Sequence, residues 1–261
     1  MRFLSLTLVF LFLGVYAWTQ PLRRSYLGAV AQSALQLEYY ADSNQVLYGY
    51  VQANWAGEGR DRVSNTSWSR WEASLRYERW FSDHWAVGGR YTSTRISNER
   101  INEWEGYGLH SGHIGERWFL VKSLHLSRLL YGISDRDDDW KVAGMAYLGR
   151  RFSLGEQDFQ LGLRYDLAKV WPTLGDARRV SETRLTLQAD VPLGRHWMLG
   201  LFAQRHTQYF FGLAQQRYNA DGELIESVPY HRLNRVNPIY GLRVRYLMQK
   251  SQARRALPWT F

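Results

Sequence analysis

The chain of 261 residues contains no cysteine, and only six of its residues are proline. The absence of cysteine excludes a disulfide-stabilised scaffold, a thiolate zinc site and catalysis by a thiol. The mean hydropathy is negative. Beyond the first 17 residues there is also no apolar run near the roughly 20 residues that a spanning helix needs. A polytopic helical membrane protein is therefore excluded.

Aromatic and basic residues are plentiful. The chain has 12 Trp, 17 Tyr and 11 Phe, far more than a solvated, disordered chain carries. It also has 33 Lys and Arg against 24 Asp and Glu. These figures indicate one large folded domain with a basic balance, which suits an anionic partner.

The N-terminus has the features of an export signal. Met1 and Arg2 precede an apolar run over residues 4–15, and Ala17 provides a small residue at the cleavage position. We expect residues 1–17 to be a signal peptide, with an uncleaved anchor as the alternative. An exported chain rarely meets nucleic acid, so we expect lipopolysaccharide phosphates or an acidic partner instead.

The remaining sequence alternates between apolar and polar residues. In residues 159–167, Phe, Leu, Leu, Tyr and Leu alternate with Gln, Gly, Arg and Asp, and residues 71–77, 85–91 and 185–193 behave similarly. Such alternation is typical of strands with two different faces. A soluble β-sandwich also alternates, but the length of these strands and the aromatics at their ends favour a membrane barrel.

We therefore predict an all-β fold, a transmembrane antiparallel up-and-down β-barrel of about 10 strands, with 12 as the alternative. The expected strands are 46–55, 68–81, 84–96, 102–114, 117–131, 140–152, 158–171, 182–193, 196–211 and 238–248. In residues 117–131 the assignment of faces is ambiguous, because Leu124 and Leu126 are in phase with Lys122 and Arg128.

The domain boundaries follow from this count. Residues 1–17 are the signal peptide, 18–44 a pre-barrel segment, 45–249 the barrel and 250–261 a C-terminal tail. Leu35, Leu37 and Tyr39 alternate as well, but an eleventh strand would break the even number of bacterial barrels unless the tail supplied a twelfth. Connections alternate between short and long, so ten strands would place both ends of the barrel on the periplasmic side.

Two segments resemble a known kind of protein. Residues 75–80 (LRYERW) lead through 82–85 (SDHW) into 87–91 (VGGRY), which is similar to the repeated hairpin of outer-membrane barrels of Bacteroidota and related bacteria. Residues 240–246 (YGLRVRY) resemble their last-strand assembly signal, with Gly241, Val244 and Tyr246 at the expected spacing. The resemblance implies an uncharacterised outer-membrane family, a domain of unknown function, and implies no activity.

Candidates for chemistry are few. Ser111 and His113 share a strand face, but in reversed order compared with the His-x-Ser of outer-membrane lipid hydrolases, so they are weak catalytic candidates. Asp135, Asp137 and Asp139 have the alternation of a calcium loop without its later Gly and Glu, so they are weak metal candidates. A protease-like set in the longest loop has no motif to fix it; it comprises Asp221, Glu223, Glu226 and His231. No cofactor is expected.

Charged residues on the polar faces are expected to point into the lumen and to pair across strands, either as filling or as an ion-selective constriction. These are Glu72, Arg76, Glu78, Arg90, Arg164, Asp166, Arg184, Asp190, Arg243 and Arg245.

The functional hypothesis is an outer-membrane barrel that is structural or binds a partner through its loops, above all through residues 212–237. A narrow channel and a lipid-modifying enzyme are the alternatives. The expected partners are outer-membrane lipid and lipopolysaccharide, the barrel-assembly machinery and another outer-membrane protein, with no nucleic acid.

Overall fold

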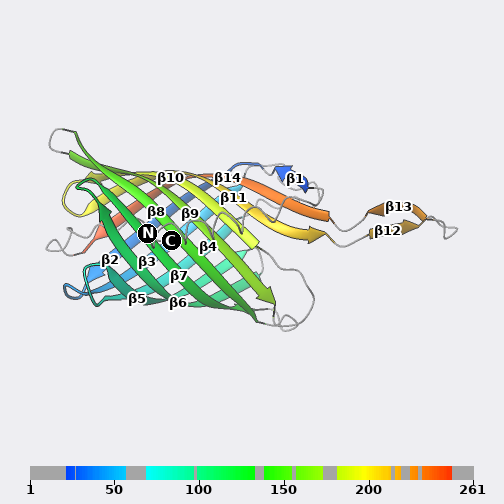
Figure 1. Cartoon of the computed structure of the whole chain (residues 1–261), viewed down its shortest axis with the longest axis horizontal. Coiled ribbons are helices and arrows are strands. Elements are labelled where there is room, and N and C mark those ends of the chain that lie inside the picture. Colours follow the sequence, from blue (N-terminus) through cyan, green and yellow to red (C-terminus); the bar gives the residue numbers. More distant parts are fainter. Residues whose placement is uncertain are drawn as a thin grey trace, which may run out of the picture.

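The structure is a computed structural model that describes residues 22–26, 28–56, 69–96, 99–132, 138–154, 157–172, 181–212, 215–218, 224–228 and 231–248. These residues form fourteen β-strands (Figure 1). Their bounds are β1 Leu22–Tyr26, β2 Val30–Tyr40, β3 Gln45–Ala56, β4 Ser69–Trp80, β5 Trp85–Ile96, β6 Glu99–Ile114, β7 Trp118–Tyr131, β8 Asp139–Leu154, β9 Gln157–Pro172, β10 Ser181–Leu193, β11 Trp197–Gly212, β12 Gln215–Tyr218, β13 Leu224–Val228 and β14 His231–Leu247.

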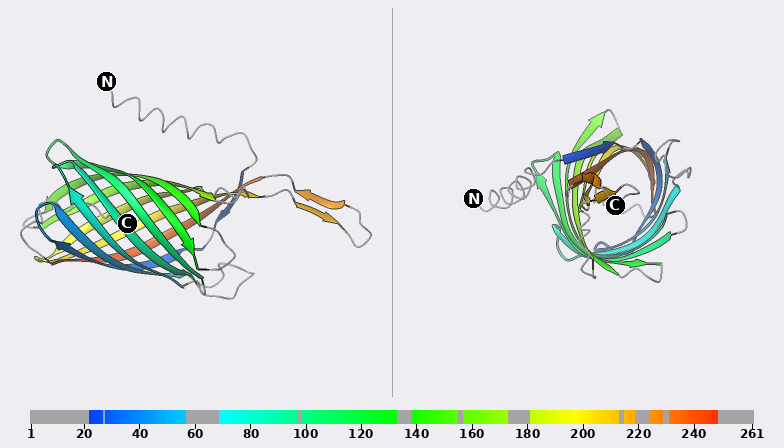
Figure 2. Two further views of the ribbon diagram at one scale, coloured as in Figure 1. Left: turned by 90° about the horizontal axis from the view of Figure 1, so that it is seen from below. Right: turned by 90° about the vertical axis from the view of Figure 1, so that its right-hand side faces the viewer.

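Eleven of these strands, β2 to β11 and β14, close a barrel, which Figure 2 shows from the side and along its axis. Neighbours in the barrel are antiparallel, except that β14 pairs with β2 in parallel, from Ile239 opposite Val30 to Leu247 opposite Glu38. The prediction of an all-β barrel of ten to twelve strands is confirmed. The assignment of residues 18–44 to a pre-barrel segment is wrong for Val30–Tyr40, and the expected even number is wrong as well. A parallel junction allows an odd number of strands.

The two ends of the barrel differ in their connections. Short connections at 41–44, 81–84, 115–117, 155–156 and 194–196 lie at one end, here called the turn end. Connections 57–68, 97–98, 132–138, 173–180 and 213–230 lie at the other, here called the loop end, where 97–98 alone is short. Because the strand number is odd, β2 begins at the loop end and β14 finishes at the turn end. The expectation that both ends of the barrel lie on one side is therefore wrong.

Side chains and glycines fix the turns at the turn end. Gly115 and Gly194 have positive φ angles of 68° and 83°, which glycine adopts without steric cost. In the first turn the backbone N–H of Asn44 donates to the Asp42 carboxylate at 2.6 Å, which closes an Asx turn. Hydrogen bonding to this amide lowers the pKa of Asp42. These local contacts set the register of the hairpins.

Each barrel strand has one apolar outward face and one polar inward face. In β4, Leu75 is 54% exposed while its neighbour Arg76 is 2% exposed. The same alternation resolves the ambiguous strand, because Leu124 and Leu126 of β7 are exposed and His125 and Ser127 are buried. Exposed tryptophans lie near both ends, with Trp55, Trp71, Trp104, Trp140 and Trp171 toward the loop end and Trp85, Trp118 and Trp197 toward the turn end.

Inward-facing glycines make room for large rings from neighbouring strands. A Cβ on Gly241 would lie 2.2 Å from the ring of Phe202, its register partner on β11. Gly88, Gly149 and Gly162 hold the rings of Tyr107, Phe119 and Tyr147 in the same way. Gly241 thus has a packing role, while Val244 and Tyr246 lie on the outward face of β14. There Tyr246 contacts the Trp197 ring at a centroid distance of 4.6 Å.

An arm projects from the loop end. The β11–β14 ladder continues to the pair Gly212–His231, and β12 and β13 form a separate antiparallel hairpin beyond it (Figure 1). β1 runs parallel to the first residues of β14, from Leu22 opposite Arg232 to Tyr26 opposite Val236. The hairpin expected in residues 212–237 is therefore present, and its tip at 219–223 lies outside the described residues.

Candidate functional site in the barrel interior

The turn-end half of the interior is packed with apolar side chains. One buried cluster comprises Trp80, Ala86, Tyr107, Leu109, Phe119, Val121, Met145 and Tyr147. A second comprises Tyr40, Val46, Tyr48 and Leu247. Most of these residues come from the turn-end parts of their strands, so together they form a plug across this half of the lumen.

An ion pair is buried within the plug. The Arg76 guanidinium contacts the Glu78 carboxylate, and the two side chains are only 2% and 0% exposed. Glu78 also accepts hydrogen bonds from the Trp80 indole N–H at 2.7 Å and from the Tyr107 hydroxyl at 3.1 Å. Arg76 lies against the Tyr107 ring, 4.5 Å from its centroid. The Arg76 charge is therefore matched by Glu78, and both oxygens of this carboxylate accept hydrogen bonds from protein groups.

A second buried pair joins the strands of the parallel junction. Arg245 of β14 lies 3.2 Å from the Glu38 carboxylate of β2, and both side chains are almost fully buried. Gln36 and Tyr40 donate to the same carboxylate at 2.7 and 3.0 Å. This pair belongs to the contacts that hold β2 in the barrel.

The loop-end half of the interior is polar and partly open. Ion pairs line it, and the outermost arginines, Arg70 and Arg184, have side chains that are 34% and 35% exposed. The pairs are Arg70–Glu72, Arg90–Glu105, Lys141–Glu103, Arg164–Asp166 and Arg184–Glu182. We call this half the chamber. Each of its five cations faces a carboxylate, so the chamber carries nearly balanced charge.

The ten charged residues expected in the lumen lie on inward faces, but most pair differently from the expectation. Arg76–Glu78, Arg164–Asp166 and Arg184–Glu182 are pairs along one strand, since residues two apart share a face at about 7 Å. The expected pairing across strands is therefore wrong for these three pairs. It holds for Arg90–Glu105 and Arg245–Glu38. Among the others, Asp190 accepts from Gln188 at 3.1 Å and the Arg243 guanidinium lies over the Phe202 ring.

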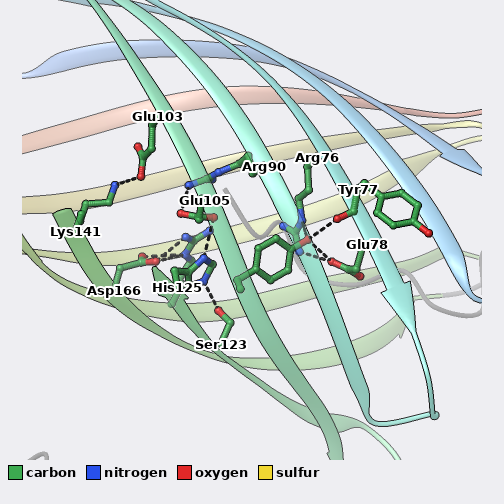
Figure 3. A network of polar contacts seen from close by, with 12 residues as sticks. Arg76, Tyr77, Glu78, Arg90, Glu103, Glu105, Ser123, His125, Lys141 and Asp166 are labelled. Atoms are coloured by element: carbon green, nitrogen blue, oxygen red, sulfur yellow. Dashed lines mark hydrogen bonds and ion pairs between the residues drawn. The ribbon is translucent and has the colours of Figure 1, made fainter. Parts of the chain in front are cut away.

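A serine, a histidine and a glutamate form a hydrogen-bonded chain on the chamber wall (Figure 3). Ser123 Oγ lies 2.6 Å from His125 Nε2, and His125 Nδ1 lies 2.9 Å from Glu105 Oε1. Arg90 donates to the other Glu105 oxygen at 2.8 Å. The His125 ring also stacks on Tyr107, with 5.3 Å between centroids. Both nitrogens of the imidazole are thus engaged, and the ring orientation is fixed.

This chain has the order of acid, imidazole and hydroxyl that activates a serine nucleophile. Glu105 accepts a hydrogen bond from Nδ1–H, which leaves Nε2 to accept a hydrogen bond from the Ser123 hydroxyl. β7 is paired with β6 and β8 on its two sides, so its backbone amides are hydrogen-bonded within the sheet and do not form an oxyanion hole. The charge of an oxyanion would have to be met by side-chain cations such as Arg90.

Sequence reasoning missed Ser123, His125 and Glu105. Ser123 and His125 are spaced two apart, which is a detectable signal, but the face of this strand was ambiguous and Glu105 is on a different strand. The expected candidates Ser111 and His113 lie at the turn end of β6, and their side chains do not hydrogen-bond to each other. The backbone carbonyl of Ser111 contacts His84 Nδ1 at 3.0 Å.

The expected metal candidates divide between described and undescribed residues. Asp139 is buried and accepts from the Tyr131 hydroxyl at 2.8 Å, while its neighbour Asp138 accepts from Arg128 at 2.6 Å. Asp135 and Asp137 lie outside the described residues, as do the signal peptide and the C-terminal tail. Within the described part, no group of three or more His, Asp or Glu side chains is placed to hold a metal ion. The protease-like set of the longest loop, Asp221, Glu223, Glu226 and His231, has no described side chains.

Comparison of the chain with protein-family models, with curated proteins and with solved structures gives no match. Within the described ranges, no helix has the length and hydropathy to cross a membrane.

Proposed function

We propose that the protein is an integral barrel of the bacterial outer membrane, exported by residues 1–17, that does not conduct and makes its contacts at the loop end. The observation that carries this proposal is that the barrel has its apolar side chains on the outside and its ion pairs on the inside, the opposite of a water-soluble protein. Large apolar side chains face outward, as in Leu187 and Leu201 at 58% and 56% exposure, whereas ion pairs are buried inside. In water this arrangement is unfavourable, because the apolar outer side chains would contact solvent while the inner ion pairs lose their hydration. In a bilayer the apolar outer face contacts lipid, which favours the arrangement.

The charge on the outward face supports the same proposal. Among the strand residues with described side chains, no exposed position carries a carboxylate. Most exposed arginines occur toward the ends of the strands, namely Arg79, Arg95, Arg100, Arg128, Arg151 and Arg235, while Arg205 lies at the middle of β11. Cations at the rims of an apolar band suit anionic lipid headgroups such as lipopolysaccharide phosphates.

The plug makes a channel the weaker alternative. Tyr147, Val121 and Leu109 are essentially inaccessible, and the buried cations Arg76 and Arg245 are ion-paired. We therefore place the protein's specific contacts in the chamber mouth, in β1 and in the β12–β13 hairpin.

Expression of the full chain in a Gram-negative host tests the proposal. The protein should fractionate with the outer membrane, require detergent for extraction, and migrate faster in electrophoresis before boiling than after it. In planar bilayers it should give no steady conductance. Recovery in the soluble periplasm would refute the membrane proposal, and large steady currents would refute the closed lumen.

A second candidate function is ester hydrolysis in the chamber, which the Ser123–His125–Glu105 contacts favour. In this reaction Ser123 Oγ attacks the ester carbonyl carbon while its proton passes to His125 Nε2. The same proton then goes to the departing alcohol, and water repeats the sequence to release the acid.

Labelling with a fluorophosphonate probe distinguishes hydrolysis from a structural network. Label should attach to the wild type and to Ser111→Ala, and should be absent from Ser123→Ala. If the folded wild type takes up no label, the contacts of Ser123 serve only to order the chamber wall.

A further inference from the structure

An apolar groove of about 1010 Å³ crosses the outer face of the barrel over β5, β6 and β7. Its walls are outward side chains on both sides, among them Leu75 and Tyr77 from β4 and Leu124 and Leu126 from β7. These four side chains are 43 to 66% exposed. The groove is therefore on the face that the proposed function turns toward lipid.

The floor of the groove consists of glycines. Gly89 and Gly106 are direct register partners on β5 and β6, and Gly108 follows on the same face. A Cβ on Gly106 or Gly108 would meet nothing within 4 Å. Packing inside the barrel therefore does not require glycine there. Glycine weakens a strand interior, and it commonly marks a place where a ligand approaches the backbone.

A cation lies at the loop-end mouth of the groove. Arg128 is the register partner of Trp104 and follows Leu124 by four residues, or about 13 Å along the strand. Its side chain is 53% exposed, donates to Asp138 and lies 6.0 Å from the Trp140 ring centroid. A guanidinium has five N–H groups, so Arg128 has capacity for a phosphate beside Asp138.

Two further arginines lie beyond this mouth. Arg95 and Arg100 occupy directly opposed, outward positions on β5 and β6, and both are exposed. Two neighbouring guanidinium groups create a positive potential that attracts an anion. This region of the rim is thus electrostatically suited to phosphate.

We propose that the groove binds one anionic, phosphate-bearing membrane lipid, with an acyl chain over Gly106 and Gly108 and the phosphate at Arg128. An apolar channel that leads to a guanidinium between two tryptophans matches the two parts of such a lipid. The proposal rests on the proposed function, because the groove must face a bilayer.

Native mass spectrometry of the detergent-purified full chain tests it with two probes of equal chain length, phosphatidylglycerol and phosphatidylcholine. The wild type should retain one phosphatidylglycerol about tenfold more readily than phosphatidylcholine. Arg128→Gln should remove this preference. Arg205→Gln, an exposed arginine on β11, is the matched control and should keep it.

The groove itself is tested by Gly106→Leu with Gly108→Leu, which should reduce retention of both lipids. Ala203→Leu adds a similar side chain to an exposed position on β11 and should not. Equal behaviour of Arg128→Gln and Arg205→Gln, or unchanged retention in the double glycine variant, would overturn the proposal. Each sample is also inserted into vesicles and checked for heat-dependent mobility. A wild-type protein that fails to insert contradicts the proposed function, whereas an inserted wild-type barrel without lipid preference contradicts only the lipid site.

Discussion

Replacing Glu78 by glutamine tests the value of charge balance inside the plug. Glutamine has nearly the same volume and retains one of the two acceptor oxygens, so it can keep the hydrogen bond from either Trp80 or Tyr107. The main loss is the negative charge facing Arg76, whose side chain is 2% exposed. At this burial, solvent cannot compensate the guanidinium for its lost partner.

The size of the effect follows from burial. Removing one member of a buried ion pair costs about 3–5 kcal/mol, because the remaining charge stays desolvated. Glu72→Gln is the matched change in the chamber, where the partner Arg70 has a side chain that is 34% exposed. Water can solvate Arg70 there, so the expected loss is about 0–1 kcal/mol. The two variants should differ by roughly 3 kcal/mol in the free energy of unfolding.

Urea titrations of the barrel folded into phosphatidylcholine vesicles, followed by tryptophan fluorescence, measure these values. Adding Arg76→Met to Glu78→Gln removes the uncompensated charge and should recover about half of the loss. Equal destabilisation by Glu78→Gln and Glu72→Gln would refute the reasoning, since burial would then not decide the cost.

Three other predictions concern the barrel and its ends. In the proposed outer-membrane location, single cysteines at the exposed positions Ala29 and Ser43 should label on opposite sides of the bilayer, because only β2 separates them. Ala29→Cys should react with an impermeant maleimide on intact cells, and equal labelling of the two would contradict the eleven-stranded topology. Gly241→Leu should lower the free energy of unfolding by about 1–3 kcal/mol in the same urea titration, because its Cβ would overlap the Phe202 ring. Replacing residues 213–230 by a two-residue turn should leave heat-dependent mobility unchanged, because among the described strands β12 and β13 pair with each other and not with the barrel.

The sequence predicts the barrel well because the two sides of its wall are chemically different. In residues 70–80 every second side chain is charged, polar or indole and points inward, while Trp71, Leu75 and Tyr77 point outward. A period of two is the direct consequence, and it is visible without knowing which strands are neighbours. Long strands and terminal tryptophans add information that is equally local.

The interior contacts are less predictable because they depend on register and on rotamers. Glu105 reaches His125 only because β6 and β7 are paired with Gly106 opposite Leu126, an alignment that alternation does not specify. Partners within one strand, such as Arg164 and Asp166, were available from spacing alone. The expectation of cross-strand pairing did not consider pairs between residues two apart on the same strand.

The inward-facing charges also bear on β2, the barrel strand that was expected to lie outside the barrel. Among the residues expected in the lumen, six are arginines and four are carboxylates, an imbalance that a narrow, desolvated interior does not tolerate. Glu103, Glu105 and Glu182, on strands that were already expected, supply part of the missing negative charge. Glu38, in the alternating stretch that includes Leu35, Leu37 and Tyr39, supplies a further carboxylate. Its position opposite Arg245 neutralises a cation of the last strand, and this requires β2 to lie beside β14. Since the directions of these two strands make that junction parallel, the rule of even numbers, which follows from antiparallel closure, does not apply. In this barrel the partner that Glu38 gives to Arg245 is a better guide to the strand count than parity. The odd count then places the first and last residues of the barrel at opposite ends.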